Sequence, residues 1–215
     1  MLKANEIYLL NEALDSKDIY GINKQTALEQ EIHSKNKAID TLKKKKIIND
    51  DNSMNEVSYH IIRNLDIFKK ANSYIWLNDI LLSLDNTQYM VFLKKDSEED
   101  EFEFKKIIKA DLMYCLLKEY SFLCKGQEKV SEKKLKLSSD EFVKEYIIDK
   151  DYDDLIIIRK EENKRINYTS AYITYYLHEN ILYKYDALKE ELYEISPINS
   201  RLEIAKIFNI EVKNE

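Results

Sequence analysis

The sequence predicts an α+β fold with a central antiparallel β-sheet and two pseudo-related halves. Four segments carry the Ser/Thr-x-x-Glu pattern that is typical of helix starts, because the hydroxyl and the carboxylate each bond a free backbone amide. Aromatic and β-branched runs, which favour strands, lie between them. The order helix, strands, helix occurs in residues 1–124 and, more loosely, in residues 137–215. We therefore expect one domain, 1–215, whose halves share a sheet and are joined by Cys124–Lys136.

Three helices are expected before the first strands. The first covers Glu6–Leu14, where apolar residues recur at helical spacing, and it ends before Gly21. The second and third are expected at Thr26–Lys45 and Ser53–Lys70, and each opens with a Ser/Thr-x-x-Glu box. Both carry an apolar stripe along one face, which predicts amphipathic helices packed on a core.

Between Ser73 and Ile108 the helical spacing of apolar residues gives way to short aromatic and β-branched runs. The runs "SYIWLNDILLSL", "QYMVFLKK" and "FEFKKIIK" are separated by short polar clusters, which predicts a three-stranded meander. The continuous apolar stretch "YMVFL" indicates a strand covered on both faces, and hence a central position in the sheet. Helical spacing returns between Leu112 and Leu123, so a helix is expected over the sheet.

The second half is expected to follow the same order. Ser138 and Glu141 form a box that starts the helix "SSDEFVKEYII". The runs "DDLIIIRK", "RINYTSAYITYYL" and "NILYKYD" predict three strands. A last helix is expected at Ser200–Phe208.

Composition narrows the functional classes. The net charge of −6 repels polyanions at long range, which disfavours nucleic acid as a partner. Cys115 and Cys124 lie in apolar surroundings without zinc-site spacing and are expected to be reduced core thiols. No apolar run resembles a signal peptide or approaches the ~18 residues of a membrane span, so a cytoplasmic protein is expected.

Catalytic groups are not apparent in the sequence. His33, His60 and His178 have no second ligand at metal spacing. Two glycines cannot build a phosphate-binding loop, and no serine lies in a nucleophile elbow. We therefore expect no enzyme activity, no cofactor and no bound metal.

An acidic cluster and a group of tyrosines are the candidate protein-binding features. The cluster lacks the spacing and glycine of a calcium loop, so it is either a solvated hairpin tip or a loop that faces a partner. The chain has 16 tyrosines, several crowded within residues 168–185, where they serve either core packing or protein recognition. The candidate partner-binding residues are Lys95, Asp96, Ser97, Glu98, Glu99, Asp100, Glu101, Tyr172, Tyr175 and Tyr183.

The lysine run Lys43–Lys46 could be read as part of a winged-helix DNA-binding module. The helix that follows, Ser53–Lys70, shows only a thin basic face, whereas a recognition helix displays basic and amide side chains toward the groove. Positive charge at the end of a helix also favours the helix dipole. The run is therefore interpreted as a solvated helix end.

The order of elements resembles the EspG-type chaperones of type VII (ESX) secretion, and is closer to their shorter Firmicute relatives. The similarity covers nearly the whole chain and includes "ANEIYLLNEAL", "AIDTLKKKKII", "NDDNSMNEVSYHIIRNLDIF" and "ADLMYCLLKEYSFL". The resemblance implies a cytosolic, non-catalytic chaperone whose central antiparallel sheet is flanked by two helical bundles. Such proteins bind the tip of a helical-hairpin secretion substrate, and their contact loop would fall here on Lys95–Glu103.

Three functional hypotheses follow from the sequence. The first is a type VII secretion chaperone or accessory factor that binds a helical secreted protein or a toxin effector. The second is an immunity protein that neutralises a toxin through its acidic surface, including the loop Asp96–Glu101. The third is a winged-helix DNA regulator that uses Lys43–Lys46.

Overall fold

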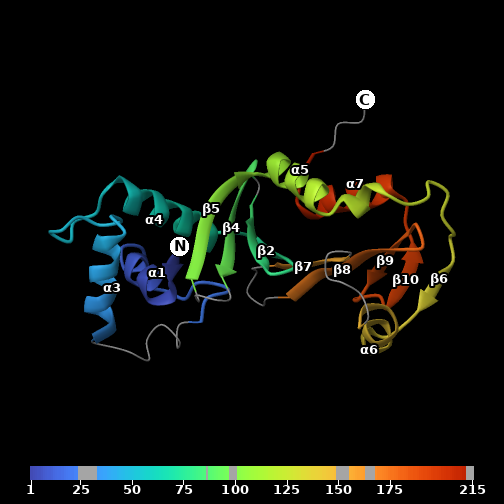
Figure 1. The fold of residues 1–215 in the computed structure, drawn as a ribbon, viewed down its shortest axis with the longest axis horizontal. Coiled ribbons are helices and arrows are strands. Elements are labelled where there is room, and N and C mark those ends of the chain that lie inside the picture. Colours follow the sequence, from blue (N-terminus) through green and yellow to red (C-terminus); the bar gives the residue numbers. More distant parts are fainter. Residues whose placement is uncertain (24–32, 86, 97–100, 149–154, 163–167, 212–215) are drawn as a thin grey trace. The chain divides into compact units, whose positions relative to one another are not determined.

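The computed structural model describes residues 1–23, 33–85, 87–96, 101–148, 155–162 and 168–211 (Figure 1). These residues form an α+β fold with a ten-stranded antiparallel sheet and six α-helices, as expected from the sequence. The chain divides into two compact units. The first contains Met1–Ala71, Asp79–Ser83 and Val91–Lys106. The second contains Asn72–Asn78, Leu84–Met90 and Ile107–Glu215.

Three helices of the first unit lie close to the expected positions. They are α1 (Ala4–Asn11), α3 (His33–Lys44) and α4 (Glu56–Lys69). The expected start at Thr26 lies outside the described residues. The expected start at Ser53 was wrong, because Ser53 Oγ and backbone N bond the Asp51 carboxylate at 2.6 and 2.9 Å. Asn55 caps α4 instead, and its side chain accepts hydrogen bonds from two backbone amides.

The strands of the first unit are ordered β1 (Leu2–Lys3), β5 (Glu101–Ile108), β4 (Tyr89–Asp96) and β3 (Ile80–Leu84). The expected place of "YMVFL" inside the sheet is confirmed, since β4 has β5 and β3 as neighbours. Helix α4 packs on these strands through Phe68, whose ring meets Phe104 edge to face at 5.5 Å. Gly21 has a φ of +80°, and a Cβ there would come within 2.4 Å of Leu81 Cδ2, so this turn requires glycine.

The expected three-stranded meander is wrong in one respect. The run "SYIWLNDILLSL" forms two strands, β2 (Ser73–Leu77) and β3, separated by a turn at Asn78 and Asp79. Asn78 adopts a positive φ of 50°, a conformation that asparagine tolerates better than most residues. Its backbone and side chain also exchange hydrogen bonds with Ile157 at 3.0 and 2.8 Å. A partner far away in sequence therefore fixes this turn.

The lysine run has a structural role in the first unit. Lys45 Nζ bonds the backbone carbonyl of Met1 at 2.8 Å, Glu6 at 2.9 Å and Glu101 at 3.1 Å. Burial alone would lower the pKa of Lys45, but the hydrogen bonds to the two carboxylates raise it overall. Lys45 thus joins the end of α3 to α1 and to the edge of the sheet.

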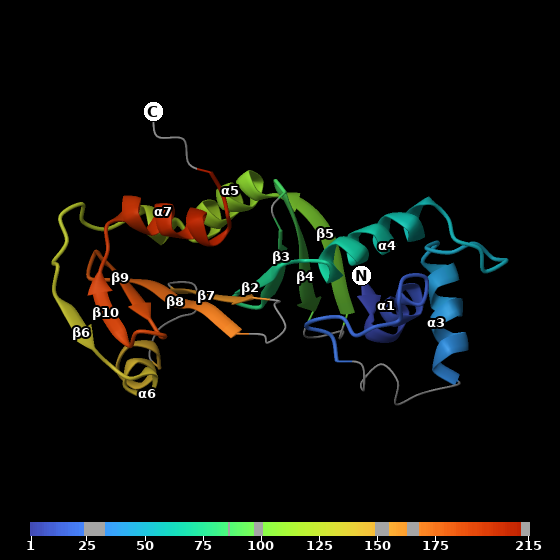
Figure 2. The same ribbon diagram turned by 180° about the vertical axis from the view of Figure 1, so that it is seen from behind.

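The second unit has the strand order β2, β7 (Leu155–Glu162), β8 (Tyr168–His178), β9 (Ile181–Asp186), β10 (Glu191–Glu194) and β6 (Lys134–Lys136). Strands β7, β8 and β9 match the expected runs, whereas the short strands β6 and β10 were not expected. Helices α5 (Lys109–Glu119) and α7 (Pro197–Ile207) lie over one face of β7–β10 (Figures 1 and 2). Helix α6 (Ser139–Phe142) and the π-helical turn Val143–Ile147 lie on the other face.

The two expected helix starts of this unit had different outcomes. Ser138 and Glu141 form the expected capping box of α6. The expected start at Ser200 was wrong, because the cap is Ser196, followed by Pro197 in the first turn. Ser200 is fully buried inside α7 and donates its hydroxyl hydrogen to the Pro197 carbonyl at 3.0 Å.

The expected burial of the cysteines was also wrong. Cys115 and Cys124 are both exposed thiols. Helix α5 turns Leu112 and Leu116 inward, four residues apart, and Cys115 therefore lies outside its buried stripe. Among the described residues, no helix combines the length and apolar character that crossing a lipid bilayer would require.

The Lys45 ion pairs can be tested by Lys45→Met. Glu6 is 1% exposed, and losing its cationic partner should lower the free energy of unfolding by about 2–4 kcal/mol, because a buried carboxylate is left uncompensated. The exposed neighbour Lys44 provides the control, since Lys44→Met should change stability by less than about 0.5 kcal/mol. Urea denaturation followed by circular dichroism measures both. Equal stability of the two variants would contradict the structural role of Lys45.

Candidate functional site

Three tyrosine rings from three elements gather on the α6 face of the second unit. Tyr176 of β8 and Tyr183 of β9 are directly opposed in the strand register. Their rings stack at a centroid distance of 5.2 Å and an angle of 14°. Tyr146, from the π-helical turn, lies 6.2 Å from Tyr176 at 45°. Cross-strand pairing and helix packing thus build one aromatic surface.

A buried aromatic cluster supports this surface. Phe142 of α6 stacks on Tyr185 with ring centroids 3.9 Å apart and an interplanar angle of 12°. The Phe142 ring also stacks with that of Tyr146 at 5.9 Å, and these residues are four positions apart on the same helical face. The Tyr185 hydroxyl donates a hydrogen bond to the Leu137 carbonyl at 3.0 Å, so its polar end is satisfied. The cluster fixes α6, and with it Tyr146, against the strands.

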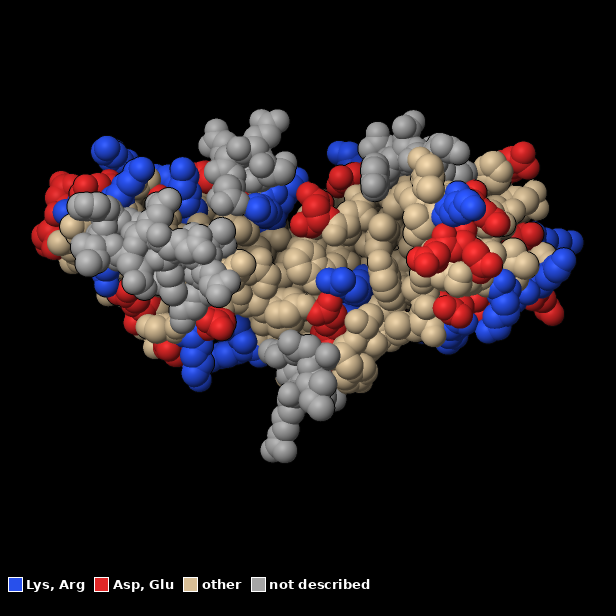
Figure 3. Space-filling view, turned by 90° about the horizontal axis from the view of Figure 1, so that it is seen from below, with Lys and Arg blue, Asp and Glu red and all other residues tan. Residues whose placement is uncertain are grey.

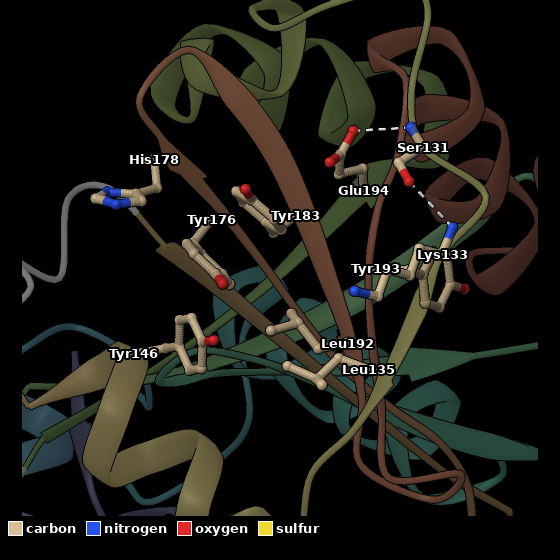
Figure 4. A pocket seen from close by; sticks show the side chains of 10 residues that line it. All are labelled: Ser131, Lys133, Leu135, Tyr146, Tyr176, His178, Tyr183, Leu192, Tyr193 and Glu194. Carbon is tan, nitrogen blue, oxygen red and sulfur yellow. Dashed lines mark hydrogen bonds between the residues drawn. The ribbon is translucent and has the colours of Figure 1, made fainter.

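The tyrosines surround a hollow of about 230 Å³ (Figure 4). A loop before β6 forms one side of it. Ser131 N donates to the Glu194 carboxylate at 2.8 Å, and Lys133 N donates to Ser131 Oγ at 3.2 Å. The lining residues are Ser131, Lys133, Leu135, Tyr146, Tyr176, His178, Tyr183, Leu192, Tyr193 and Glu194.

The hollow contains an ammonium group and several phenol hydroxyls, all of which can donate hydrogen bonds. Figure 4 shows the Lys133 side chain extending into the hollow toward Tyr183 and Leu192. Among the described residues, no carboxylate forms an ion pair with the Lys133 ammonium. Burial raises the pKa of Tyr176, and burial followed by Glu194 and Glu179 raises the pKa of Tyr183. Both phenols therefore remain protonated donors near neutral pH.

The opposite face of the same strands contains a network of three ionisable groups, of which Tyr175 and Lys184 are buried. Tyr175 donates its hydroxyl hydrogen to Glu203 Oε2 at 2.9 Å, and Lys184 Nζ lies 2.7 Å from the same oxygen. Burial would lower the pKa of Lys184, but its hydrogen bonds to Glu203 and Tyr193 raise it overall. The three groups satisfy one another and tie α7 to β8 and β9. Their arrangement indicates a structural role.

The predicted tyrosines fall in different environments. Tyr183 lines the hollow. Tyr172 is 38% exposed on β8 and is paired with Arg159 of β7. Tyr175 is fully buried, because the alternation along β8 turns it toward α7. The structure brings together Tyr176 and Tyr183 but sends Tyr175 to the other face.

The predicted loop residues belong to the first unit. Lys95 is exposed near the end of β4, with its ammonium 6.0 Å from the centre of the Phe102 ring. Asp96 ends that strand, and Ser97, Glu98, Glu99 and Asp100 lie outside the described residues. Glu101 is half-buried and binds Lys45. The contact role of this loop stays a prediction.

Sequence reasoning missed several residues of the hollow. Tyr146 could have been found from its position four residues after Phe142 on a capped helix. Leu135 and Leu192 were missed because their strands have only three and four residues. Lys133 lies in the loop before β6, and Glu194 is the last residue of β10. The pairing of these two short strands brings both residues to the hollow.

The three histidines lie in separate places. His178 lines the hollow, and His60 is exposed on α4. Within the described ranges, no three His, Cys, Asp or Glu side chains come together as potential metal ligands. His33 begins α3, in the first unit.

Comparison with known proteins gives one family match. The family model described as "Domain of unknown function (DUF5081)" matches residues 1–215. A search of curated proteins gives no match. The family match covers the whole chain and leaves the resemblance to EspG-type chaperones as a hypothesis.

The burial of the tyrosines predicts a specific alkaline response. A raised folded-state pKa means that the stability contribution is complete below the unfolded value of about 10 and is lost as pH rises above it. Tyr176→Phe should therefore flatten the decline in unfolding free energy by roughly 2 kcal/mol between pH 10 and 12, since each pH unit is worth about 1.4 kcal/mol. Urea denaturation at several pH values measures this.

The control for the alkaline experiment is Tyr59→Phe, because Tyr59 is 63% exposed. This variant should keep the wild-type decline. If Tyr176→Phe declines as steeply as the wild type, Tyr176 titrates normally in the folded state and the assigned burial effect is wrong.

Proposed function

The chain belongs to the DUF5081 family over its full length, and we propose that it is a non-catalytic chaperone or accessory factor of type VII secretion. It binds a helical secretion substrate, or the targeting partner of an effector, in the cytoplasm and keeps that protein soluble until export. The single observation that carries this proposal is the tyrosine-lined hollow of the second unit, with its apolar rim.

The rim supplies apolar surface for a partner. Leu135, which lines the hollow, is 44% exposed, and Val143, on the same helical segment as the lining residue Tyr146, is 47% exposed. Neighbouring exposed apolar side chains favour a protein interface, while tyrosine adds contact area at low entropic cost. A chaperone for a helical substrate requires such a surface, because it has to cover the apolar stripe of the helix.

The preformed geometry of the hollow also favours binding. Its floor is fixed by the stacked rings of Phe142 and Tyr185, and its tyrosines are held by strand pairing. Side chains that are already ordered lose little conformational entropy when a partner binds. This makes the hollow a suitable anchor at the centre of a larger interface.

Charge supports a protein partner over a polyanion. Viewed from the side on which α6 lies, positive and negative side chains are interspersed with uncharged surface on the second unit (Figure 3). The net charge of the whole chain is −6. A nucleic-acid-binding surface would instead carry a contiguous patch of Lys and Arg side chains. Within the first unit, Lys45 of the lysine run is already bound to two carboxylates.

The ionisable groups buried in the second unit favour a non-catalytic role. Tyr175, Lys184 and Glu203 bond one another and anchor α7. Glu203 also lines the hollow between β10 and α7, but both Tyr175 and Lys184 bond its Oε2, whereas a general base is positioned to accept a proton from a substrate. These residues are therefore assigned to stability.

The proposal is tested by co-expression with the helical proteins encoded beside the gene. A stable complex should co-purify, and Tyr183→Ala should weaken it at least about tenfold in Kd, because a tyrosine anchor is worth about 1.4 kcal/mol or more at the centre of an interface. Isothermal titration calorimetry of the purified partners measures the change.

The matched control is Tyr59→Ala, which removes an exposed tyrosine from α4 of the first unit. It should leave Kd unchanged. A wild-type chain that ignores every such neighbour would overturn the proposed function, and an unchanged Kd for Tyr183→Ala would remove the hollow from it.

A further inference from the structure

We propose that the hollow is a subsite for an aromatic side chain of the partner, and that the Lys133 ammonium binds a carboxylate beside that side chain. This inference rests on the proposed function and names the chemistry that its binding surface recognises. Four features carry it: the size of the hollow, the geometry of its rings, the position of Lys133 and the engagement of Glu194.

The hollow has the right size for one ring. Its volume is about 230 Å³, and an apolar cavity of about 150 Å³ is already sufficient to hold benzene. Leu135 and Leu192 from β6 and β10 form an apolar side opposite the tyrosines. A phenylalanine, tyrosine or tryptophan side chain can therefore enter without displacing the surrounding strands.

The geometry of the rings favours an aromatic occupant over an aliphatic one. Tyr176 and Tyr183 are nearly parallel at 14°, whereas Tyr146 is tilted by 45° to Tyr176. Tyr176 is 1% exposed and stacks on Tyr183, so an entering ring would meet the half-buried rings of Tyr146 and Tyr183. Each such aromatic contact stabilises the bound ring beyond the burial of its surface.

Lys133 gives the hollow a preference for an anion. Its side chain extends into the hollow (Figure 4), and within the described part of the chain no carboxylate is bound to its ammonium. A carboxylate from the partner would accept a charge-assisted hydrogen bond there.

Among the described residues that line the hollow, Glu194 is the one carboxylate, and it does not cancel this preference. Glu194 accepts the hydrogen bond from Ser131 N at 2.8 Å. Figure 4 places Glu194 beside Ser131, away from Tyr146 and from the apolar side formed by Leu135 and Leu192. His178 lies at the far side from the loop. Glu194 thus holds the loop that carries Lys133, and the Lys133 ammonium can bind the carboxylate of the ligand.

The hollow on the opposite face does not offer the same chemistry. It has a volume of about 280 Å³ and lies between β10 and α7. Its Glu203 is already bound to Tyr175 and Lys184. The hollow beside α6 is therefore the better candidate for a ligand site.

Small probes test the inference without the partner. N-acetyl-phenylalanine carries both the ring and the carboxylate, its amide lacks the carboxylate, and N-acetyl-leucine lacks the ring. Nuclear magnetic resonance titrations of the full chain should shift the methyl signals of Leu135 and Leu192, with a Kd on the order of millimolar for N-acetyl-phenylalanine. The amide and the leucine derivative should each bind roughly 3- to 10-fold more weakly.

The variant Lys133→Met should abolish the preference for the acid over the amide and leave binding of the amide unchanged. Lys133 is exposed, so this substitution should not impair folding. The control is Lys129→Met, which removes an exposed lysine of the same loop and should keep the preference. Equal affinities for the three probes, or shifts that avoid Leu135 and Leu192, would overturn the inference.

The outcomes separate this inference from the proposed function. If the partner complex forms and is insensitive to Lys133→Met while the probes fail to bind, the subsite is wrong and the chaperone function stands. If no helical secretion substrate binds the chain although the probes enter the hollow, the chaperone function is wrong and the ring and carboxylate preference stands.

Discussion

The stack of Phe142 on Tyr185, with ring centroids 3.9 Å apart, is the interaction on which the binding surface depends. Helix α6 has only four residues and a π-helical turn, too few to be stable without tertiary packing. Phe142 provides that packing, and the capping box of Ser138 and Glu141 satisfies the first amides of the helix. Because Tyr146 follows one turn later, the same stack determines where the third tyrosine of the hollow lies.

The strands beneath the hollow are restrained from both faces. On one side, Tyr176 and Tyr183 pack against the α6 cluster. On the other, Tyr175 and Lys184 converge on a single oxygen of Glu203 and hold α7. Alternation along β8 and β9 divides these roles between adjacent residues. A platform fixed in this way would lose little conformational entropy on binding a partner, which supports the proposed recognition function.

Local sequence signals succeeded where the interaction was itself local. The box at Ser138 was predicted because both of its members lie within one turn and bond each other. The same pattern failed at Ser53 and Ser200. Ser53 is bonded by Asp51 in the preceding turn, and Ser200 is buried within α7, the helix that Ser196 and Pro197 begin. A short motif shows which hydrogen bonds a residue can form. The partners that surround it in the folded chain determine which of these bonds is made.

The sequence by itself determined the α+β class, the approximate places of the helices and the three long strands of the second unit, because periodicity and capping act over a few residues. It also singled out Tyr183 as a candidate contact. Only the tertiary structure decided that Tyr183 opens to a hollow while Tyr175 is buried, since a shift of one position along a strand changes the face. Lys133, Tyr146 and Tyr183 come from three separate elements. Strand pairing and the packing of α6 bring them together, and both depend on contacts between segments that are far apart in the sequence.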